Sequence, residues 1–339
     1  MKLRTVFSIL VLLVLFPFSA FAAEYDNGAI RLVIDEQTGR FSLYALNYKN
    51  NRHEPMALFV DQDPRTSFLQ LIVNERSYKL GDTSVFRVRL SGTEHNPSLV
   101  FESTFMLVNQ QFSFMKSDDS SETNGIKISF TLENRGDRQI MAGARFLLDT
   151  NLGESGFHLT TDKRTISSET LLTSIDGDSF WKDKNNTISV TGNLFTGSPQ
   201  DPDSIHFANW KKLNDIPWKA DYNPGKNFNL LPYSVGDSAL CYYYEIRPLS
   251  RGEKRSFSQY IFLNSEKFIN SIFKPAGESI QDIPSVTYPS FSGTIEQDMA
   301  AIKILINRIN DLMASGASEE ELAYMEIALN SLRSKYGSN

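Results

Sequence analysis

The chain has 339 residues, with 34 Lys and Arg against 40 Asp and Glu, which gives a formal net charge of −6. An acidic chain without a basic block argues against a nucleic-acid partner and against binding to anionic lipid surfaces. The single cysteine, Cys241, excludes an internal disulfide, and we interpret it as a small apolar core residue.

The first 22 residues have the three parts of a secretory signal peptide. Lys2 and Arg4 form a positive start, residues 6–16 are apolar, and a small-x-small cleavage sequence ends at Ala22. The apolar run is too short for a membrane span, which needs about 20 residues. We therefore expect cleavage near Ala22, a periplasmic or secreted location and no membrane-spanning segment. The loss of two positive charges takes the formal net charge from −6 to −8.

Apolar and polar residues alternate with a period of two through much of residues 23–265, the pattern of half-buried β-strands. Residues 30–45 predict a β-hairpin that turns at Gly39, and residues 126–149 predict a second one that turns at 134–137. Further strands are predicted at 68–73, 86–90, 99–108, 238–246 and 256–263. Since no amphipathic helix separates these strands, the sequence predicts a mainly β domain, a large antiparallel two-sheet sandwich.

The strand at 238–246 is apolar on both faces, so we expect it at the centre of a sheet. The strand signal weakens between residues 151 and 204, where only short strands near 165–172 and 187–190 are predicted. Long loops on a β-scaffold often carry binding sites.

Aromatic residues gather among polar residues between positions 181 and 233. Trp and Tyr combine an apolar ring with a polar tip, which suits stacking on sugars or anchoring a partner protein. The alternative is that these rings close the open end of the sandwich. The predicted ligand-binding residues are Trp181, Trp210, Trp218, Tyr222 and Tyr233.

A Pro- and Gly-containing linker is predicted at 266–293, followed by a helical hairpin at 294–336 whose two amphipathic helices are separated at Gly316. Such helices must pack on each other and on something else, either the sandwich or a second chain. The apolar positions predicted to bind a partner are Ile302, Leu305, Ile309, Leu322, Met325 and Leu329.

No residue pattern in the sequence indicates a particular reaction. The four histidines (His53, His95, His158 and His206) lack zinc-site spacing, and we interpret them as surface or loop residues. The oxygen-rich residues 176–185 match no calcium loop and predict a polar surface loop. A hydrolytic carboxylate pair could be drawn from Asp149, Glu154 and Glu245 if strand ends bring two of them together. We assign no catalytic residue, metal or cofactor.

Two segments carry a resemblance to known proteins. The hairpin with Glu-Asn-Arg-Gly-Asp at 133–137, followed by ARFLLDTNLGE at 144–154, resembles the galactose-mutarotase-like supersandwich, a two-sheet fold. The segment from Pro202 to Leu240 is similar to uncharacterised secreted proteins of spirochaetes. The first resemblance implies a fold and a possible link to carbohydrates, and we carry over no catalytic residue from it.

These observations favour a non-catalytic exported protein that binds a partner through its aromatic loops and its C-terminal helical hairpin. The spirochaete likeness implies an association with the cell envelope or with periplasmic flagella. The alternative function is a carbohydrate-binding or carbohydrate-processing domain. The expected partner is accordingly another periplasmic protein or a glycan.

Overall fold

The computed structural model describes residues 22–49, 52–60, 66–82, 84–150, 152, 159–265 and 336. The chain divides into two units, Met1–Ala276 and Gly277–Asn339, and the fold below is that of the first. Except for Ala22 and Tyr336, the predicted signal peptide, linker and helical hairpin lie outside the described residues.

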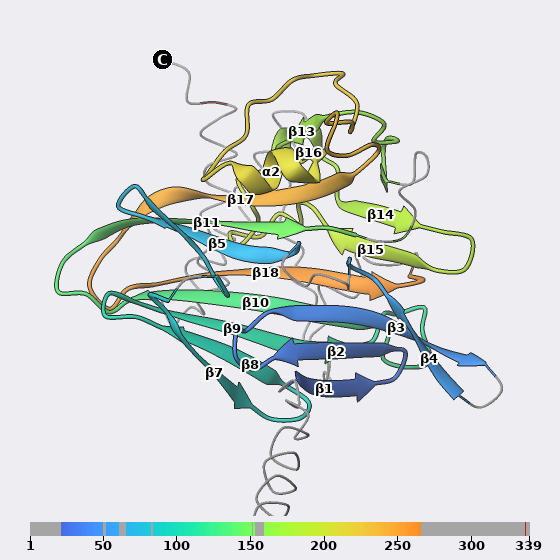
Figure 1. Ribbon diagram of the computed structural model, residues 1–339, viewed down its shortest axis with the longest axis horizontal. Helices are drawn as coiled ribbons and strands as arrows, with labels where there is room; N and C mark the ends of the chain where they lie inside the picture. Colours follow the sequence, from blue (N-terminus) through green and yellow to red (C-terminus); the bar gives the residue numbers. More distant parts are fainter. Residues whose placement is uncertain are drawn as a thin grey trace, which may run out of the picture. The chain divides into compact units, whose positions relative to one another are not determined.

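The described strands pair antiparallel in three sheets (Figure 1). The four-stranded sheet has the order β1 (Ala22–Asn27), β2 (Ile30–Asp35), β3 (Phe41–Lys49), β4 (Arg52–Ala57). The eight-stranded sheet has the order β12 (Thr160–Thr161), β14 (Phe180–Lys184), β15 (Ser189–Asn193), β18 (Lys254–Leu263), β10 (Gly125–Asn134), β9 (Met106–Met115), β8 (Pro97–Glu102), β7 (Arg87–Gly92). The six-stranded sheet has the order β13 (Thr170–Leu172), β16 (Ser204–Asn209), β17 (Ser238–Leu249), β11 (Ile140–Leu148), β5 (Phe68–Val73), β6 (Arg76–Lys79).

Side chains from all three sheets meet in one hydrophobic core. The ring of Phe41 on β3 lies 5.0 Å from that of Phe112 on β9 and 6.4 Å from that of Phe146 on β11. Phe130 on β10 lies 5.0 Å from Phe146, which joins the eight-stranded and six-stranded sheets directly. The alternation seen in the sequence explains this packing. Every second residue of β2 turns inward and is buried, and so does every second residue of β10 from Ile126 onward.

The mainly β, antiparallel architecture is confirmed, but the sheets number three among the described residues, where the sequence predicted two. Period-two alternation shows which face of a strand is buried and does not show which strand lies beside it. The strands of residues 22–57 form a sheet of their own, which shares the core of the other two.

One predicted hairpin is confirmed and the other is wrong. Strands β2 and β3 pair through residues 30–45, and Gly39 supplies the positive φ of +72° at their turn. The strands at 126–149 do not pair: β10 lies between β9 and β18, whereas β11 lies between β5 and β17. Residues 135–139 therefore carry the chain across the core from one sheet to another, with Phe130 and Phe146 facing each other.

Strand β17 is central in its sheet and buried on both faces from Ser238 to Tyr244, as predicted. Beyond Tyr244 it contains a β-bulge, since Ala142 pairs with Arg247 but Ala144 pairs with Tyr244. Two residues of β17 thus lie opposite Gly143 alone, and the side-chain alternation shifts by one position after the bulge.

Among the described residues, two short helical segments interrupt the strands, a 3-10 turn at η1 (Ser174–Asp176) and the helix α2 (Trp210–Asp215). The sequence did not predict α2, because six residues are too few to show a helical period. Asn209 begins this helix by accepting a hydrogen bond from Lys212 N at its side-chain oxygen. Within the described residues, no helix has the length and hydropathy of a membrane span.

Candidate functional site

The outer face of the six-stranded sheet is covered by α2 and by the segment that follows it, residues 216–237, which we call the covering loop (Figure 1). A small second cluster of buried side chains lies here, between the sheet and this cover. Trp210, Trp218 and Ala220 pack against it; its buried members are Phe68, Leu147, Ala208, Leu213, Ala239, Cys241 and Tyr243.

Arg145 of β11 fixes the first part of the cover. Its guanidinium is fully buried and donates to the carbonyl oxygens of Leu213 (2.7 Å) and Trp218 (3.1 Å). The same group donates twice to Gln70 Oε1, and Gln70 in turn donates to the Pro217 carbonyl at 2.6 Å. A buried charge is tolerated only when its donors are satisfied, so this network holds the end of α2 on the sheet.

Glu169 fixes the middle of the cover. Its Oε1 atom accepts hydrogen bonds from Lys212 Nζ (2.6 Å), from the Asn223 N–H (2.8 Å) and from His206 Nε2 (3.0 Å). Lys212 also donates to the carbonyl of Asp221 at 2.5 Å. Because an ionised carboxylate can only accept, His206 carries its proton on Nε2. One carboxylate thus links β16, α2 and the covering loop.

The pKa values of this cluster follow from burial and from its charges. Burial alone would raise the pKa of Glu169, but the hydrogen bonds from Lys212 and Asn223 and the charge of Lys212 hold it below its ordinary value. Burial lowers the pKa of His206, against the opposing effect of Glu169. The arrangement at neutral pH is an ionised Glu169, a charged Lys212 and a neutral His206.

His206 corrects the sequence-based interpretation, which placed all four histidines on the surface or in loops. It lies on β16 and is 1% exposed, while His95 is exposed as predicted and His158 lies outside the described residues. No sequence signal joins Glu169, His206 and Lys212, since only the sheet and the cover bring them together.

Trp181 is a core residue in this structure. It lies on β14, is 0% exposed, and donates from its indole nitrogen to the hydroxyl of Tyr242 at 2.5 Å. The sequence placed Trp181 in a polar loop because Asp, Lys and Ser surround it, whereas those neighbours belong to an edge region of the eight-stranded sheet. A ligand cannot reach its ring here.

Trp210 and Trp218 are half-buried and attach the cover to the sheet. The Trp210 indole donates to the Thr66 carbonyl at 2.9 Å, and the ring of Trp218 lies edge-on to that of Tyr243 at 5.8 Å. These two rings lie on the outer face of the six-stranded sheet, whereas the alternative considered from the sequence placed aromatic rings at the open end of the sandwich.

Tyr222 and Tyr233 are exposed, by 43% and 70%. Tyr222 lies edge-on to the His206 ring at 5.9 Å, and Tyr233 lies under the ammonium group of Lys211 at 5.2 Å from its ring centre. Tyr233 has two exposed apolar neighbours, Leu231 at 75% and Val235 at 70%. We call residues 229–236, which present these three side chains, the tip loop.

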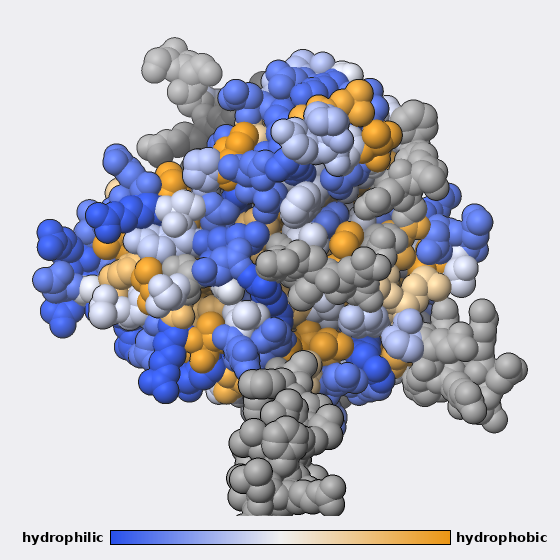
Figure 2. All heavy atoms as spheres, viewed as in Figure 1, coloured by the Kyte–Doolittle hydropathy of each residue, from blue (hydrophilic) through white to orange (hydrophobic). Residues whose placement is uncertain are grey.

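The side chain of Asn209 holds the base of the tip loop, and Asn229 Oδ1 accepts a hydrogen bond from Gly236 N across it. The amide of Asn209 donates to the carbonyls of Phe228 and Asp237 and to the hydroxyl of Ser234, at 2.8–3.1 Å. Inside the loop, Ser234 N and Tyr233 N both donate to the Leu230 carbonyl. In Figure 2 a few hydrophobic residues (orange) lie among hydrophilic ones (blue) at the top of the molecule, where the covering loop runs in Figure 1.

The other candidate groups do not form a site. Asp178 is buried and is bound by Thr161 and Arg164, and the described residues contain no cluster able to hold a metal ion. Asp149 follows β11, whose Leu148 pairs with Leu240, whereas Glu245 lies at the bulge. Asp149 and Glu245 are thus separated by the length of six residues of β17. At the rise per residue of a strand this is about 20 Å, so the two carboxylates cannot act as a hydrolytic pair.

Glu154 and the apolar positions of the predicted helical hairpin lie outside the described residues. Their proposed roles in hydrolysis and in partner binding stay predictions.

No known protein family matches the sequence, and no curated protein matches it either. Several solved structures align with this chain at low sequence identity. A putative aldose 1-epimerase from Escherichia coli K12 is 8% identical, with a TM-score of 0.42 over 72% of this chain and 98% of its own. A galactose mutarotase-like protein from Lactobacillus casei is 10% identical, with a TM-score of 0.44 over 72% and 100%.

A homologue of galactose mutarotase and aldose epimerase from C. elegans is 9% identical, with a TM-score of 0.44 over 72% of this chain and 98% of its own. The resemblance found in the sequence also points to proteins of this kind. At such identities and TM-scores we carry over neither a site nor an activity, and the likeness to spirochaete proteins stays a prediction.

Proposed function

We propose that this chain is an exported, non-catalytic binding protein that docks a partner protein through its tip loop. The observation that carries the proposal is the exposure of Leu231, Tyr233 and Val235, by 75%, 70% and 70%, on a loop whose base is fixed. Large apolar side chains gathered on a monomer's surface mark interaction sites more often than chance exposure does.

The composition of the tip favours a protein over a sugar. Sugar rings stack on flat aromatic faces, and one face of Tyr233 is occupied by Lys211. Leu231 and Val235 are aliphatic and suit an apolar pocket of a partner, in which an aromatic anchor and its neighbours exclude water.

The anchors described above support the proposal because they order the loop in advance. Asn209 clamps both ends of the tip loop, while Glu169 and Arg145 hold the covering loop beneath it. Ordering a free loop on binding costs about 0.5–1.5 kcal/mol for each immobilised side chain. A loop that is already fixed avoids most of that cost.

The test is site-specific photo-crosslinking of the full chain in its own host. A photoreactive residue at position 233 should give a discrete crosslinked protein, and the same residue at position 175 should not. Ile175 is a matched control, because it is 94% exposed on the separate turn η1.

A double substitution in the tip, Leu231→Ser with Val235→Ser, should abolish the crosslink at 233 without lowering the melting temperature. A crosslink that survives this change, or one equally strong from position 175, would contradict docking through the tip loop. Recovery of a shortened chain in the extracytoplasmic fraction would support export, and recovery of the uncut chain in the cytoplasm would oppose it.

Carbohydrate binding is the second candidate, favoured by one observation, the exposed ring and hydroxyl of Tyr222 beside a cluster rich in hydrogen-bond donors. It predicts glycan-array signals that are lost in Tyr222→Ala and kept in Leu231→Ser. An array without signals for the natural chain would remove this candidate. The proposal also includes the predicted helical hairpin as a second contact with the partner protein. If that contact exists, deletion of residues 294–339 should lower the amount of partner recovered.

A further inference from the structure

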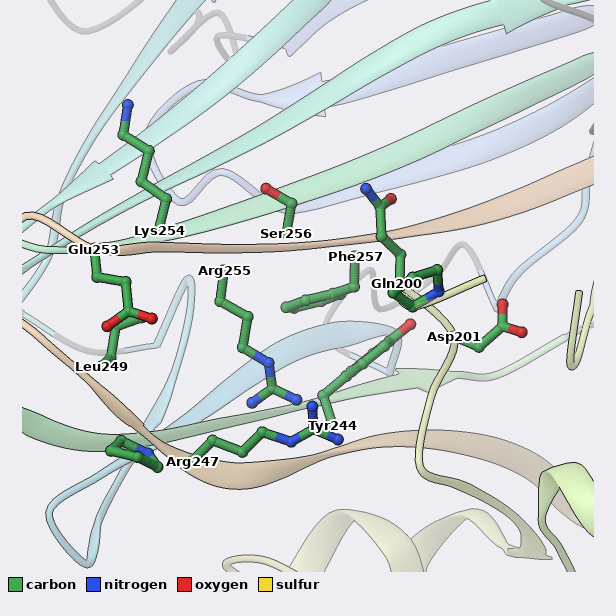
Figure 3. A pocket seen from close by; sticks show the side chains of 12 residues that line it. Gln200, Asp201, Tyr244, Arg247, Leu249, Glu253, Lys254, Arg255, Ser256 and Phe257 are labelled. Carbon is green, nitrogen blue, oxygen red and sulfur yellow. The ribbon is translucent and has the colours of Figure 1, made fainter. Parts of the chain in front are cut away.

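The pocket at the ends of β17 and β18 is lined by charged side chains that bind one another. It has a volume of about 210 Å³ (Figure 3). The Asp203 carboxylate lies 2.5 Å from Arg247 Nη2 and 3.6 Å from Arg255 Nη2. Asp201 accepts hydrogen bonds from Thr196 and from the N–H groups of its own turn. We interpret these groups as a structural link between β17 and β18 and assign the pocket no ligand.

The turn between β14 and β15 presents four consecutive exposed residues, Lys184 to Thr187. The two strands pair as far as Lys184 and Ser189, so residues 185–188 form the connection, on the right of Figure 1. Ile188 is buried in the hydrophobic core and fixes the turn to the body of the protein. The residues before it are open to solvent and to a reagent from outside.

Asn185 and Thr187 form the acceptor sequence for N-linked glycosylation, Asn-x-Ser/Thr with a residue other than proline at x. This sequence occurs once in the chain. Asn96 also has a hydroxyl residue two positions later, Ser98, but Pro97 lies between them and excludes that site. Because so short a pattern also arises by chance, the geometry of the turn has to decide whether Asn185 can react.

The Asn185 carboxamide has a defined orientation. Its Oδ1 atom accepts hydrogen bonds from the N–H groups of Thr187 (2.8 Å) and Ile188 (2.9 Å). Since a backbone N–H can only donate, these contacts identify the oxygen and leave the amide nitrogen on the other side. Among the described residues, Nδ2 contacts only Met56 Sδ, a weak acceptor at 3.8 Å. The nitrogen is therefore available for a new bond.

The two hydrogen bonds to Oδ1 also favour reaction at Nδ2. An amide nitrogen becomes nucleophilic when it loses a proton, and the negative charge then moves to the amide oxygen. Backbone N–H groups already directed at that oxygen stabilise the charge, as they do in an oxyanion hole. The second recognition element is accessible as well, because Thr187 is exposed and no described residue binds its hydroxyl.

We propose that Asn185 is a site of N-linked glycosylation. A bond forms between Nδ2 and the anomeric carbon of a sugar carried on a lipid diphosphate, and the bond from that carbon to the phosphate oxygen breaks. The lipid diphosphate leaves with the electron pair, and the Nδ2 proton passes to a base of the transferase. Such sites are modified on exported proteins, so the modification rests on the export included in the proposed function and not on docking through the tip loop.

Mass spectrometry of the chain isolated from its own host tests the proposal. The peptide that contains residue 185 should carry a glycan, and electron-transfer fragmentation should place that glycan on Asn185. Thr187→Ser should keep the modification and Thr187→Val should lose it. Both variants retain Asn185 and the backbone N–H groups that orient it, so neither outcome depends on a disrupted turn.

Asn186→Gln is the matched control, because Asn186 is exposed in the same turn and occupies the position where any residue except proline is accepted. It should keep the glycan, whereas Asn185→Gln should lose it. Thermal unfolding of each variant shows whether it is folded.

Two results would overturn the site while leaving export intact. One is an unmodified Asn185 in a chain whose signal peptide has been removed. The other is a glycan that survives Thr187→Val, which would mean attachment through another residue or another recognition sequence. An uncut and unmodified chain in the cytoplasm would oppose export itself, and the glycosylation site with it.

Discussion

At the scale of single residues, the structure depends on a few large side chains whose burial the sequence concealed. Trp181 of β14 lies directly opposite Gly192 of β15, and the missing side chain of that glycine makes room for the indole. A Cβ added at Gly192 would lie 2.4–2.5 Å from the Trp181 ring atoms, far inside contact distance.

Gly192→Ala should therefore destabilise the protein by about 1–3 kcal/mol, the usual cost of overpacking a core. The measurement is urea unfolding followed by tryptophan fluorescence. In a Trp181→Phe background the same substitution should cost much less, because the smaller ring leaves space for the methyl group. An equal cost in both backgrounds would show that the two residues do not interact as described.

Some of this could have been predicted and some could not. A tryptophan in a run of Asp, Lys and Ser gives no period-two signal, so nothing local distinguishes a short strand from a loop around Trp181. Arg145 did leave a signal, a lone charge inside the apolar run of β11, since charged residues are almost never buried without partners. The partners themselves, Leu213 and Trp218, are some 70 residues away and could not be named.

At the scale of elements, most predicted strands are present, but the one predicted at 99–108 is wrong, because it spans the turn between β8 and β9. Of the two predicted hairpin pairings, only that of β2 with β3 is confirmed. Burial alternates along β2 and β10 as the residue pattern indicates, and β17 is buried on both faces. The segment from β10 to β11 resembles a hairpin in sequence, yet it joins two sheets across the core. Turn residues such as Asn134 and Gly136 reverse the chain in either case, so local chemistry does not choose between the two outcomes.

The Glu169 cluster makes the attachment of the covering loop depend on pH. His206 and Glu169 both have a pKa below the ordinary values of 6.5 and 4.5, so the unfolded chain binds more protons than the folded one as the pH falls. The stabilisation of the fold that comes from neutral His206 is fully present above pH 6.5 and is lost as the pH falls below that value. The stabilisation that comes from ionised Glu169 is lost as the pH falls below 4.5.

We expect the hydrogen-exchange protection of the Asn223 amide, which donates to Glu169, to fall as the pH is lowered from 7 towards 4. His206→Gln should remove the upper part of this change, and the exposed His95→Gln should leave it intact. Protection that stays constant over this range would refute the role of the cluster as an anchor.

At the scale of the whole molecule, Cys241 reports on the integrity of the buried cluster between the six-stranded sheet and its cover. It lies on the central strand β17, is 0% exposed, and burial raises the pKa of its thiol to about 11. Because the thiolate is the reactive form, the native protein keeps this sulfur both inaccessible and protonated.

A thiol reagent at pH 8 should therefore label Cys241 at least about 10³ times more slowly than an exposed cysteine, at a rate set by global unfolding. Arg251→Cys in a Cys241→Ala background provides the exposed reference. Labelling of the natural chain as fast as that reference would mean that β17 opens locally. Reducing agents should not change the melting temperature, since the chain cannot form an internal disulfide.

The order of strands has a consequence for synthesis. Strand β18, the last described strand, lies between β10 and β15, and β17 lies between β11 and β16. A nascent chain that has not yet delivered residues 238–263 therefore carries two sheets that are each split in the middle, with unpaired edges able to join to other chains. Both sheets can therefore be completed only after these last described strands have left the ribosome.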